Sequence, residues 1–327
     1  MVKLRTFLLS VLFFAAPIIA GCGDSLLDDS VNRLGSDTQS RVAHESWGFY
    51  RLYRYESGTW QTVVDQQGPT GQRPLLNERP VLLVHGLGSN ISSDRLNNLA
   101  DSLVSSGATS VFGFEYDSLD PISTNGAFLI EAMNYLTADE QARVWRLVGH
   151  SMGGLVVRSA IESRVDLGTA PDGNLVSFVA VPHLGSEVAE ELQEEDSSIV
   201  QQAIAQLVLN GDLFFFNADG RPIDVMGTEP SFQELVPNSA FLEALNFEAS
   251  NRHPEWIYRT LAGTERDRDY EVFNRAIGVF ADDGIVNVGS ATAAVIGPAE
   301  QSTVPQDHSA IILAESAVLI ILRQLNF

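Results

Sequence analysis

A serine flanked on both sides by glycines stands where a predicted strand meets a predicted helix. The motif reads Gly-His-Ser-Met-Gly at residues 149–153 and has Ser151 at its centre. The run 144–148 is short and mostly apolar, as in a buried strand, whereas the run 154–161 has the apolar face of a helix. A Cβ at either flanking glycine would clash where strand and helix pass closely, and the serine hydroxyl is exposed at the carboxyl edge of the sheet. Ser151 is therefore the candidate nucleophile for covalent catalysis.

A second glycine-rich turn follows an earlier run, 80–84, that has the pattern of another buried strand. The turn reads His-Gly-Leu-Gly at residues 85–88. A serine that attacks an acyl group needs two backbone N–H donors, fixed in advance, for the oxyanion that forms. Met152, directly after the nucleophile, supplies one at the positive end of its helix. We assign the other to Leu87, in the turn after the earlier strand.

The general base is sought among the histidines that follow Ser151, because the fold in which a serine stands at such a strand-to-helix turn has the chain order nucleophile, acid, histidine. His183 ends the next strand, and no acid that suits the order lies between it and the serine. His253 precedes the predicted strand 256–262. His308 lies in a late loop before an apolar C-terminal helix and is the candidate base. The other histidines are interpreted as a surface residue and as structural members of their motifs: His44, His85 and His150.

The acid is sought between the strand 256–262 and His308, where two adjacent aspartates precede a glycine. It must accept the imidazole N–H, hold one tautomer and stabilise the imidazolium. Asp283, directly before Gly284, is our choice, and Asp282 is its close rival. Other carboxylates suit the role less, because arginines flank them in a pattern typical of solvated ion pairs or because they adjoin the histidine in the chain: Asp267, Asp269 and Asp307.

These motifs resemble those of the serine lipases of the α/β-hydrolase superfamily. The chain looks most like the bacterial triacylglycerol lipases and the neighbouring acyltransferase and inositol-deacylase groups. The segments that carry the resemblance occur in the expected order: VHGLG at 84–88, GHSMGG at 149–154, VPHLGS at 181–186, LVPNSAFLEALN at 235–246, DDGIV at 282–286 and DHSAI at 307–311. The resemblance implies an α/β-hydrolase fold and a catalytic triad of Ser151, Asp283 and His308.

The same resemblance bears on metals and cofactors. Some of these lipases hold a structural calcium near the catalytic histidine through an aspartate two residues after it. Ala310 occupies that position here, so no calcium is carried over. Acyl transfer through a serine uses side chains and water alone, and we therefore expect no metal and no organic cofactor.

The wider pattern predicts an α/β class fold. Strand and helix patterns alternate from about residue 79 to residue 180, which indicates a mostly parallel sheet with helices on both faces. Alternating runs on either side of Ser57-Gly58 predict a hairpin before the first parallel strand. We expect one hydrolase domain over residues 46–327, with an inserted helical cap or lid at about 187–230.

That insertion begins with acidic residues and continues with an apolar stripe at helical spacing from Ile199 to Val208. Leu213-Phe214-Phe215-Phe216 follows. Such a stripe is typical of core, and it also suits a lid whose apolar face meets lipid. Its position between the strand ending at Val181 and the candidate acid favours the lid.

The N-terminus has the features of an export signal. Lys3 and Arg5 precede the apolar stretch 7–19, which is short for a membrane span. Ile19-Ala20-Gly21-Cys22 resembles a bacterial lipobox, which implies a lipoprotein signal peptide at 1–21 and a lipid on Cys22. Cys22 is the only cysteine, so it has no disulfide partner within the chain.

The residues after Cys22 suggest how an anchored domain would be attached. Residues 22–45 are polar and irregular, which predicts a flexible tether. Gly23 favours the outer over the inner membrane, by resemblance to enterobacterial sorting. We therefore expect an exported protein, lipid-anchored in the bacterial cell envelope.

The net charge of the chain excludes some classes of binding partner. The chain carries a formal net charge of −22, and loss of the two basic residues of the signal makes the charge more negative still. Such a chain does not bind nucleic acid through its phosphates, and anionic membrane surfaces and anionic substrates should repel it. Nothing in the sequence indicates an oligomeric state.

The residues thus predict a serine hydrolase of carboxylic esters, with neutral lipid esters as the expected substrates. Three alternatives stay open. An acyltransferase or a phospholipase would use the same triad, and a non-catalytic envelope protein, such as a lipid chaperone or foldase, would keep the fold only for binding. Loss of a triad member is the usual mark of the last class, and all three candidate members are present.

Overall fold

The computed structural model describes the chain in the following ranges: 50–76, 79–91, 94–137, 144–162, 173–191, 193, 229–247, 256–266, 282–293, 297 and 300–327. The expected signal peptide and tether lie outside the described residues, as does most of the expected cap. The same holds for four residues weighed above: His44, His253, Asp267 and Asp269.

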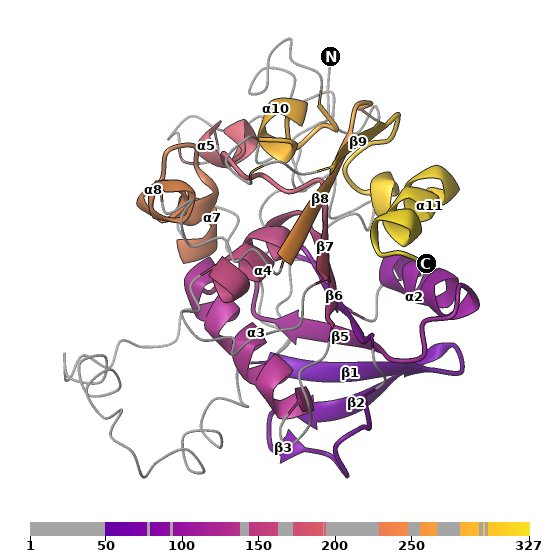
Figure 1. Ribbon diagram of the computed structural model, residues 1–327. Coiled ribbons are helices and arrows are strands. Elements are labelled where there is room, and N and C mark those ends of the chain that lie inside the picture. Colours follow the sequence, from indigo (N-terminus) through magenta and orange to yellow (C-terminus); the bar gives the residue numbers. More distant parts are fainter. Residues whose placement is uncertain are drawn as a thin grey trace, which may run out of the picture. The chain divides into compact units, whose positions relative to one another are not determined.

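The described residues form a nine-stranded mixed sheet in the order β3-β2-β1-β5-β4-β6-β7-β8-β9 (Figure 1). β1, β2 and β3 are antiparallel to their neighbours, whereas the strands from β5 through β9 are mutually parallel. The strand bounds are β1 Tyr50–Glu56, β2 Thr59–Asp65, β3 Gly68–Pro69, β4 Val81–Val84, β5 Val111–Tyr116, β6 Arg146–His150, β7 Asn174–Val179, β8 Trp256–Gly263 and β9 Glu300–Val304.

The predicted hairpin is formed by β1 and β2. Its turn residues, Ser57 and Gly58, have φ angles of 52° and 83°, the left-handed conformations that a two-residue hairpin turn requires. β1 then pairs antiparallel with β5, where Leu52 faces Phe114. The hairpin therefore covers the edge of the parallel part of the sheet.

Helices pack on both faces of the sheet. α3 (Ile122–Thr137) and α4 (Met152–Glu162) lie on one face with α7 (Pro230–Leu235) and α8 (Ala240–Phe247), and α2 (Asp94–Ser105) and α11 (Glu315–Gln324) lie on the other (Figure 1). Each face has its own apolar core, because successive side chains of a strand point to opposite faces. Leu82 and Phe114 belong to the α3–α4 core, whereas Leu83 and Val148 belong to the α2–α11 core.

Three of the parallel strands are buried along their whole length. Every residue of β4, β5 and β7 is buried, as expected for parallel strands covered on both faces. β9, at the edge, is mostly polar and mostly exposed. Among the described helices, none combines the length and the apolar character that crossing a bilayer requires.

Two short helices follow the parallel strands near the carboxyl edge of the sheet. α5 (Glu187–Glu191) follows β7, and α10 (Val288–Ala291) follows β8 in the chain. The two segments are joined, because Asn287 donates a side-chain hydrogen bond to Glu187 (2.6 Å). A 3₁₀ turn, η4 (Ala310–Ile312), precedes α11.

Candidate active site

Ser151 stands between β6 and α4, as the motif predicts. Its φ of 53° is in the left-handed region, which is strained for a residue with a side chain. Its N–H donates to the carbonyl oxygen of Val179 in β7 (2.9 Å), which holds the turn against the sheet. A Cβ at Gly149 would collide with the backbone of Gly154, and one at Gly153 with the carbonyl oxygens at the end of β4. The steric reason expected for both glycines is confirmed.

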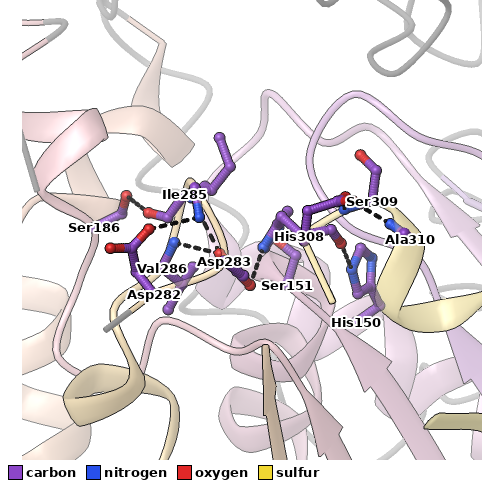
Figure 2. A network of polar contacts seen from close by, with 12 residues as sticks. His150, Ser151, Ser186, Asp282, Asp283, Ile285, Val286, His308, Ser309 and Ala310 are labelled. Carbon is purple, nitrogen blue, oxygen red and sulfur yellow. Dashed lines mark hydrogen bonds and ion pairs between the residues drawn. The ribbon is translucent and has the colours of Figure 1, made fainter. Parts of the chain in front are cut away.

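Three polar side chains from distant parts of the chain form a continuous hydrogen-bonded series at this turn (Figure 2). His308 Nε2 lies 2.9 Å from Ser151 Oγ, and His308 Nδ1 lies 2.8 Å from Asp283 Oδ2. An ionised carboxylate can only accept, so Nδ1 carries the proton and Nε2 is left to accept from the serine hydroxyl. All three residues are less than 10 % exposed.

Asp283, rather than Asp282, is the carboxylate beside the histidine. Its second oxygen, Oδ1, accepts from the N–H groups of Ile285 (3.1 Å) and Val286 (2.8 Å). Its carbonyl oxygen accepts from the N–H of His308 (2.9 Å), so side chain and backbone both join the two residues. These bonds direct Oδ2 at the imidazole and leave the carboxylate little freedom to turn.

Asp282 is equally buried but has different partners. It forms an ion pair with Arg266, and its Oδ1 also accepts from the N–H of Gly284 (2.7 Å). Figure 2 shows it on the side of the turn away from His308. The partnership with Arg266 was missed by sequence reasoning, which associated the arginines near 267 with solvated ion pairs.

The backbone around His308 is held from two further sides. Asp307 Oδ1 accepts from the N–H groups of Ser309 (2.9 Å) and Ala310 (2.8 Å), so this aspartate stabilises its own turn. His150 Nε2 lies 3.1 Å from the carbonyl oxygen of His308, and the two rings are 5.1 Å apart at their centroids. The contact of His150 with His308 was also missed, and only its place next to the nucleophile could have indicated it.

The glycine-rich turn after β4 lies directly against the serine. A Cβ at Gly86 would come within 2.8 Å of Ser151 Cβ, so the chain can approach this closely only with glycine there. Leu87 follows, and Met152 is the first residue of α4. Neither backbone N–H donates a hydrogen bond to another described residue. Both groups are therefore available to a ligand, and their role as oxyanion donors stays a prediction.

His85 supports this turn from within. Its ring stacks on Tyr116 (centroids 4.3 Å apart), whose hydroxyl donates to the carbonyl oxygen of His85 (2.7 Å). The Tyr116 N–H donates to Nε2 (3.3 Å), so Nδ1 carries the proton and donates to the carbonyl oxygen of Gly86 (2.8 Å). Burial lowers the pKa of His85 and keeps the ring neutral.

His183 does not join the site. It is buried edge-on against the ring of Phe178 (5.0 Å), and its carbonyl oxygen accepts from Asn246 of α8 (2.9 Å). Within the described part of the chain, no three His, Cys, Asp or Glu side chains gather as a metal site would require.

Comparisons with known proteins agree with this architecture. A family model described as "Domain of unknown function (DUF7379)" matches residues 48–208. No curated protein matches the chain. Among solved structures, the mature lipase BlEst2 of Bacillus licheniformis is 17% identical with a TM-score of 0.58, over 85% of this chain and 98% of that one.

Two further structures extend the comparison. Phospholipase PlaB of Legionella pneumophila is 16% identical with a TM-score of 0.58, over 76% of this chain and 60% of that one. A metagenomic carboxyl esterase is 21% identical with a TM-score of 0.52, over 79% of each chain. At these identities the likeness concerns the fold, and it confirms the expected α/β-hydrolase fold.

Proposed function

We propose that this protein is a serine hydrolase of carboxylic esters that acts through an acyl-serine intermediate. The observation that carries the proposal is the unbroken hydrogen-bonded series from Ser151 through His308 to Asp283. The fold supports it, since the similar structures include proteins named as a lipase, a phospholipase and a carboxyl esterase.

Acylation follows from the geometry. His308 Nε2 takes the proton of Ser151 as Oγ attacks the ester carbonyl carbon, and Asp283 stabilises the imidazolium that forms. The carbonyl oxygen becomes an oxyanion, which the N–H groups of Leu87 and Met152 stabilise. The imidazolium then protonates the departing alkoxide, the carbon–oxygen bond to the alcohol breaks, and the acyl group stays on Ser151.

Deacylation repeats these steps with water. His308 takes a proton from a water molecule as the water oxygen attacks the carbonyl carbon of the acyl-serine. The N–H groups of Leu87 and Met152 stabilise the second oxyanion. The bond to Oγ breaks, His308 returns its proton to Ser151, and the carboxylic acid leaves. An alcohol in place of water would make the enzyme an acyltransferase.

Neutral lipid esters are the substrate class that we propose. The net charge of −22 opposes the approach of anionic substrates, including anionic phospholipids. Phospholipid is the second candidate, supported by the fold shared with PlaB. A lid at about 187–230 and a lipid anchor on Cys22, holding the enzyme in the cell envelope, complete the proposal.

The test is hydrolysis of a long-chain p-nitrophenyl ester by the full chain in mild detergent. Ser151→Ala serves as the blank and should lower kcat by about 10⁴-fold or more, because the triad acts as a unit. Near-normal turnover by Ser151→Ala would remove Ser151 as the nucleophile. Absence of turnover by the folded wild type would favour the acyltransferase or the binding protein.

A further inference from the structure

The ion pair between Arg266 and Asp282 has no part in the chemistry above, yet Asp282 adjoins the acid of the proposed triad. We infer that Arg266 is a positioning residue, which acts on His308 through Asp282. It holds the turn 282–286, called the acid turn below, in place. It also compensates the charge of the Asp282 carboxylate. The inference rests on the proposed function.

Arg266 lies beside the backbone that carries the base. Beyond the end of β8, the N–H of Thr264 donates to Val304 (3.0 Å) and that of Glu265 to Gln306 (3.3 Å). The segment 264–266 therefore runs alongside 304–306, and His308 follows two residues later. Arg266 extends from this paired backbone to the acid turn, so one side chain connects the two segments that bring acid and base together.

The acid turn divides its N–H groups between two carboxylates. The N–H of Gly284 binds Asp282 (2.7 Å), whereas those of Ile285 and Val286 bind Asp283. Arg266 adds two donors to Asp282, with Nε 2.5 Å from Oδ1 and Nη2 bound to Oδ2. A two-pronged contact of this kind fixes orientation as well as distance. Asp282 is thus held from both sides, and the N–H groups of Ile285 and Val286 are left to orient Asp283.

The pair also has an electrostatic consequence. Asp282 and Asp283 are each 1 % exposed, and two adjacent buried carboxylates repel each other unless one is compensated. Arg266 compensates Asp282, which leaves Asp283 as the one buried uncompensated carboxylate of the turn. Three other titratable groups belong to the segments next to His308: His150 in the strand–helix turn, Asp307 in its own loop, and Glu265, whose backbone pairs with Gln306.

Removing the positive partner and removing the negative partner of this ion pair should therefore have opposite effects. The quantity to follow is the acid limb of the pH profile of kcat/KM, which is the low-pH side where activity falls as the base becomes protonated. Arg266→Gln leaves an uncompensated carboxylate that favours the imidazolium, so the limb should move to higher pH by about half a pH unit. Asp282→Asn leaves an unpaired guanidinium that disfavours the imidazolium, so the limb should move to lower pH. The double variant should lie close to wild type.

The experiment uses the full chain in mild detergent and the same ester, with Arg259→Gln as matched control. Arg259 lies in β8, before the segment 264–266, and its partners are Glu300 (3.3 Å) and the backbone at the end of α11, so its loss should leave the profile unchanged. Arg266→Lys restores the charge without the two-pronged contact and should recover the pH midpoint but only part of kcat. We expect Arg266→Gln to lower kcat about tenfold or more with KM little changed, since a misdirected acid slows the chemical step.

A second readout needs no substrate. The proton shared by His308 Nδ1 and Asp283 should give a far-downfield NMR signal, and its pH titration should move in the same opposite directions. Equal-sign shifts or no shift in the two single variants, with thermal unfolding showing folded protein, would overturn the inference. If Arg266→Gln fails to fold, the test relies on the other two variants: the pH midpoint should fall in Asp282→Asn and should stay at the wild-type value in Arg266→Lys. Failure of the proposed function is distinguishable, because wild type would then lack Ser151-dependent turnover while the NMR titration still tests the coupling.

Discussion

Asp282 and Asp283 are adjacent in the chain, equally buried and bound in the same turn, yet they serve different partners. The difference arises from the geometry of the turn, in which the Asp283 carboxylate points toward His308 and the Asp282 carboxylate toward Arg266. Residue type alone carries no such distinction. Roles at this site are therefore assigned by hydrogen-bond partners, and substitution should separate them.

Asparagine at each of the two positions provides that test. Asp283→Asn should lower kcat by about 10⁴-fold, because the amide no longer holds the imidazole in the productive tautomer or stabilises the imidazolium. Asp282→Asn should cost far less. The measurement is kcat of both variants for the same ester at the pH optimum, and the reverse order would move the triad acid by one residue.

At the scale of elements, the turn after β4 depends on a histidine that must stay neutral. The pKa of His85 is lowered from 6.5 by burial, so its stabilising contribution is full above that value and is lost as pH falls. We expect the wild-type free energy of unfolding to decrease by up to about 1.4 kcal/mol per pH unit below 6.5 from this residue.

Denaturation in urea between pH 7.5 and pH 5 checks this dependence. His85→Gln should be less stable at neutral pH but should lose less stability on acidification than wild type. His150→Gln is the control, since His150 is only partly buried and its loss should keep most of the wild-type slope. A slope in His85→Gln as steep as that of wild type would assign the pH dependence elsewhere.

A buried ion pair within α4 is joined to α8 by a hydrogen bond. Arg158 is fully buried, binds Glu162 through two nitrogens (2.9 and 3.0 Å) and donates to Asn246 (2.9 Å). Arg158→Met should lower the free energy of unfolding by about 3–5 kcal/mol, because it leaves Glu162 charged and unpaired in the interior. Arg158→Met with Glu162→Gln should recover part of the loss.

Urea denaturation of the single and double variants gives both values. Arg323→Gln, at an exposed pair with Glu300, is the control and should change stability by less than about 0.5 kcal/mol. Equal destabilisation by the single and double variants would mean that packing, and not charge, explains the role of Arg158.

The strands and helices were predicted from the sequence wherever hydrophobic pattern was strong. The Ser151 turn, the hairpin around Ser57 and the strand at 256–262 were of this kind, since local spacing determines them. β9 had no such signal, because it is a polar edge strand paired with β8 alone. Two contacts could not be predicted from the sequence either: that of Arg266 with Asp282 and that of His150 with His308. Each joins residues from separate loops, which come together only when the sheet has formed.

At the scale of the whole molecule, charge and location are linked in the proposal. A chain with a net charge of −22 is repelled by anionic bilayers, so attachment would depend on the lipid at Cys22. Mass spectrometry of the mature N-terminus should show a lipid-modified Cys22, and Cys22→Ser should release the protein from the membrane fraction. An unmodified Cys22 in the mature protein would refute the anchor.

The backbone hydrogen bond between Ser151 and Val179 has one more consequence. The nucleophile is hydrogen-bonded to the neighbouring strand, and its base and acid come from connections more than a hundred residues further along the chain. The serine can be activated only while the central strands keep their register. A phosphonate reagent that reacts with activated serines would therefore count intact molecules, and its labelling should disappear together with the cooperative loss of the sheet during denaturation.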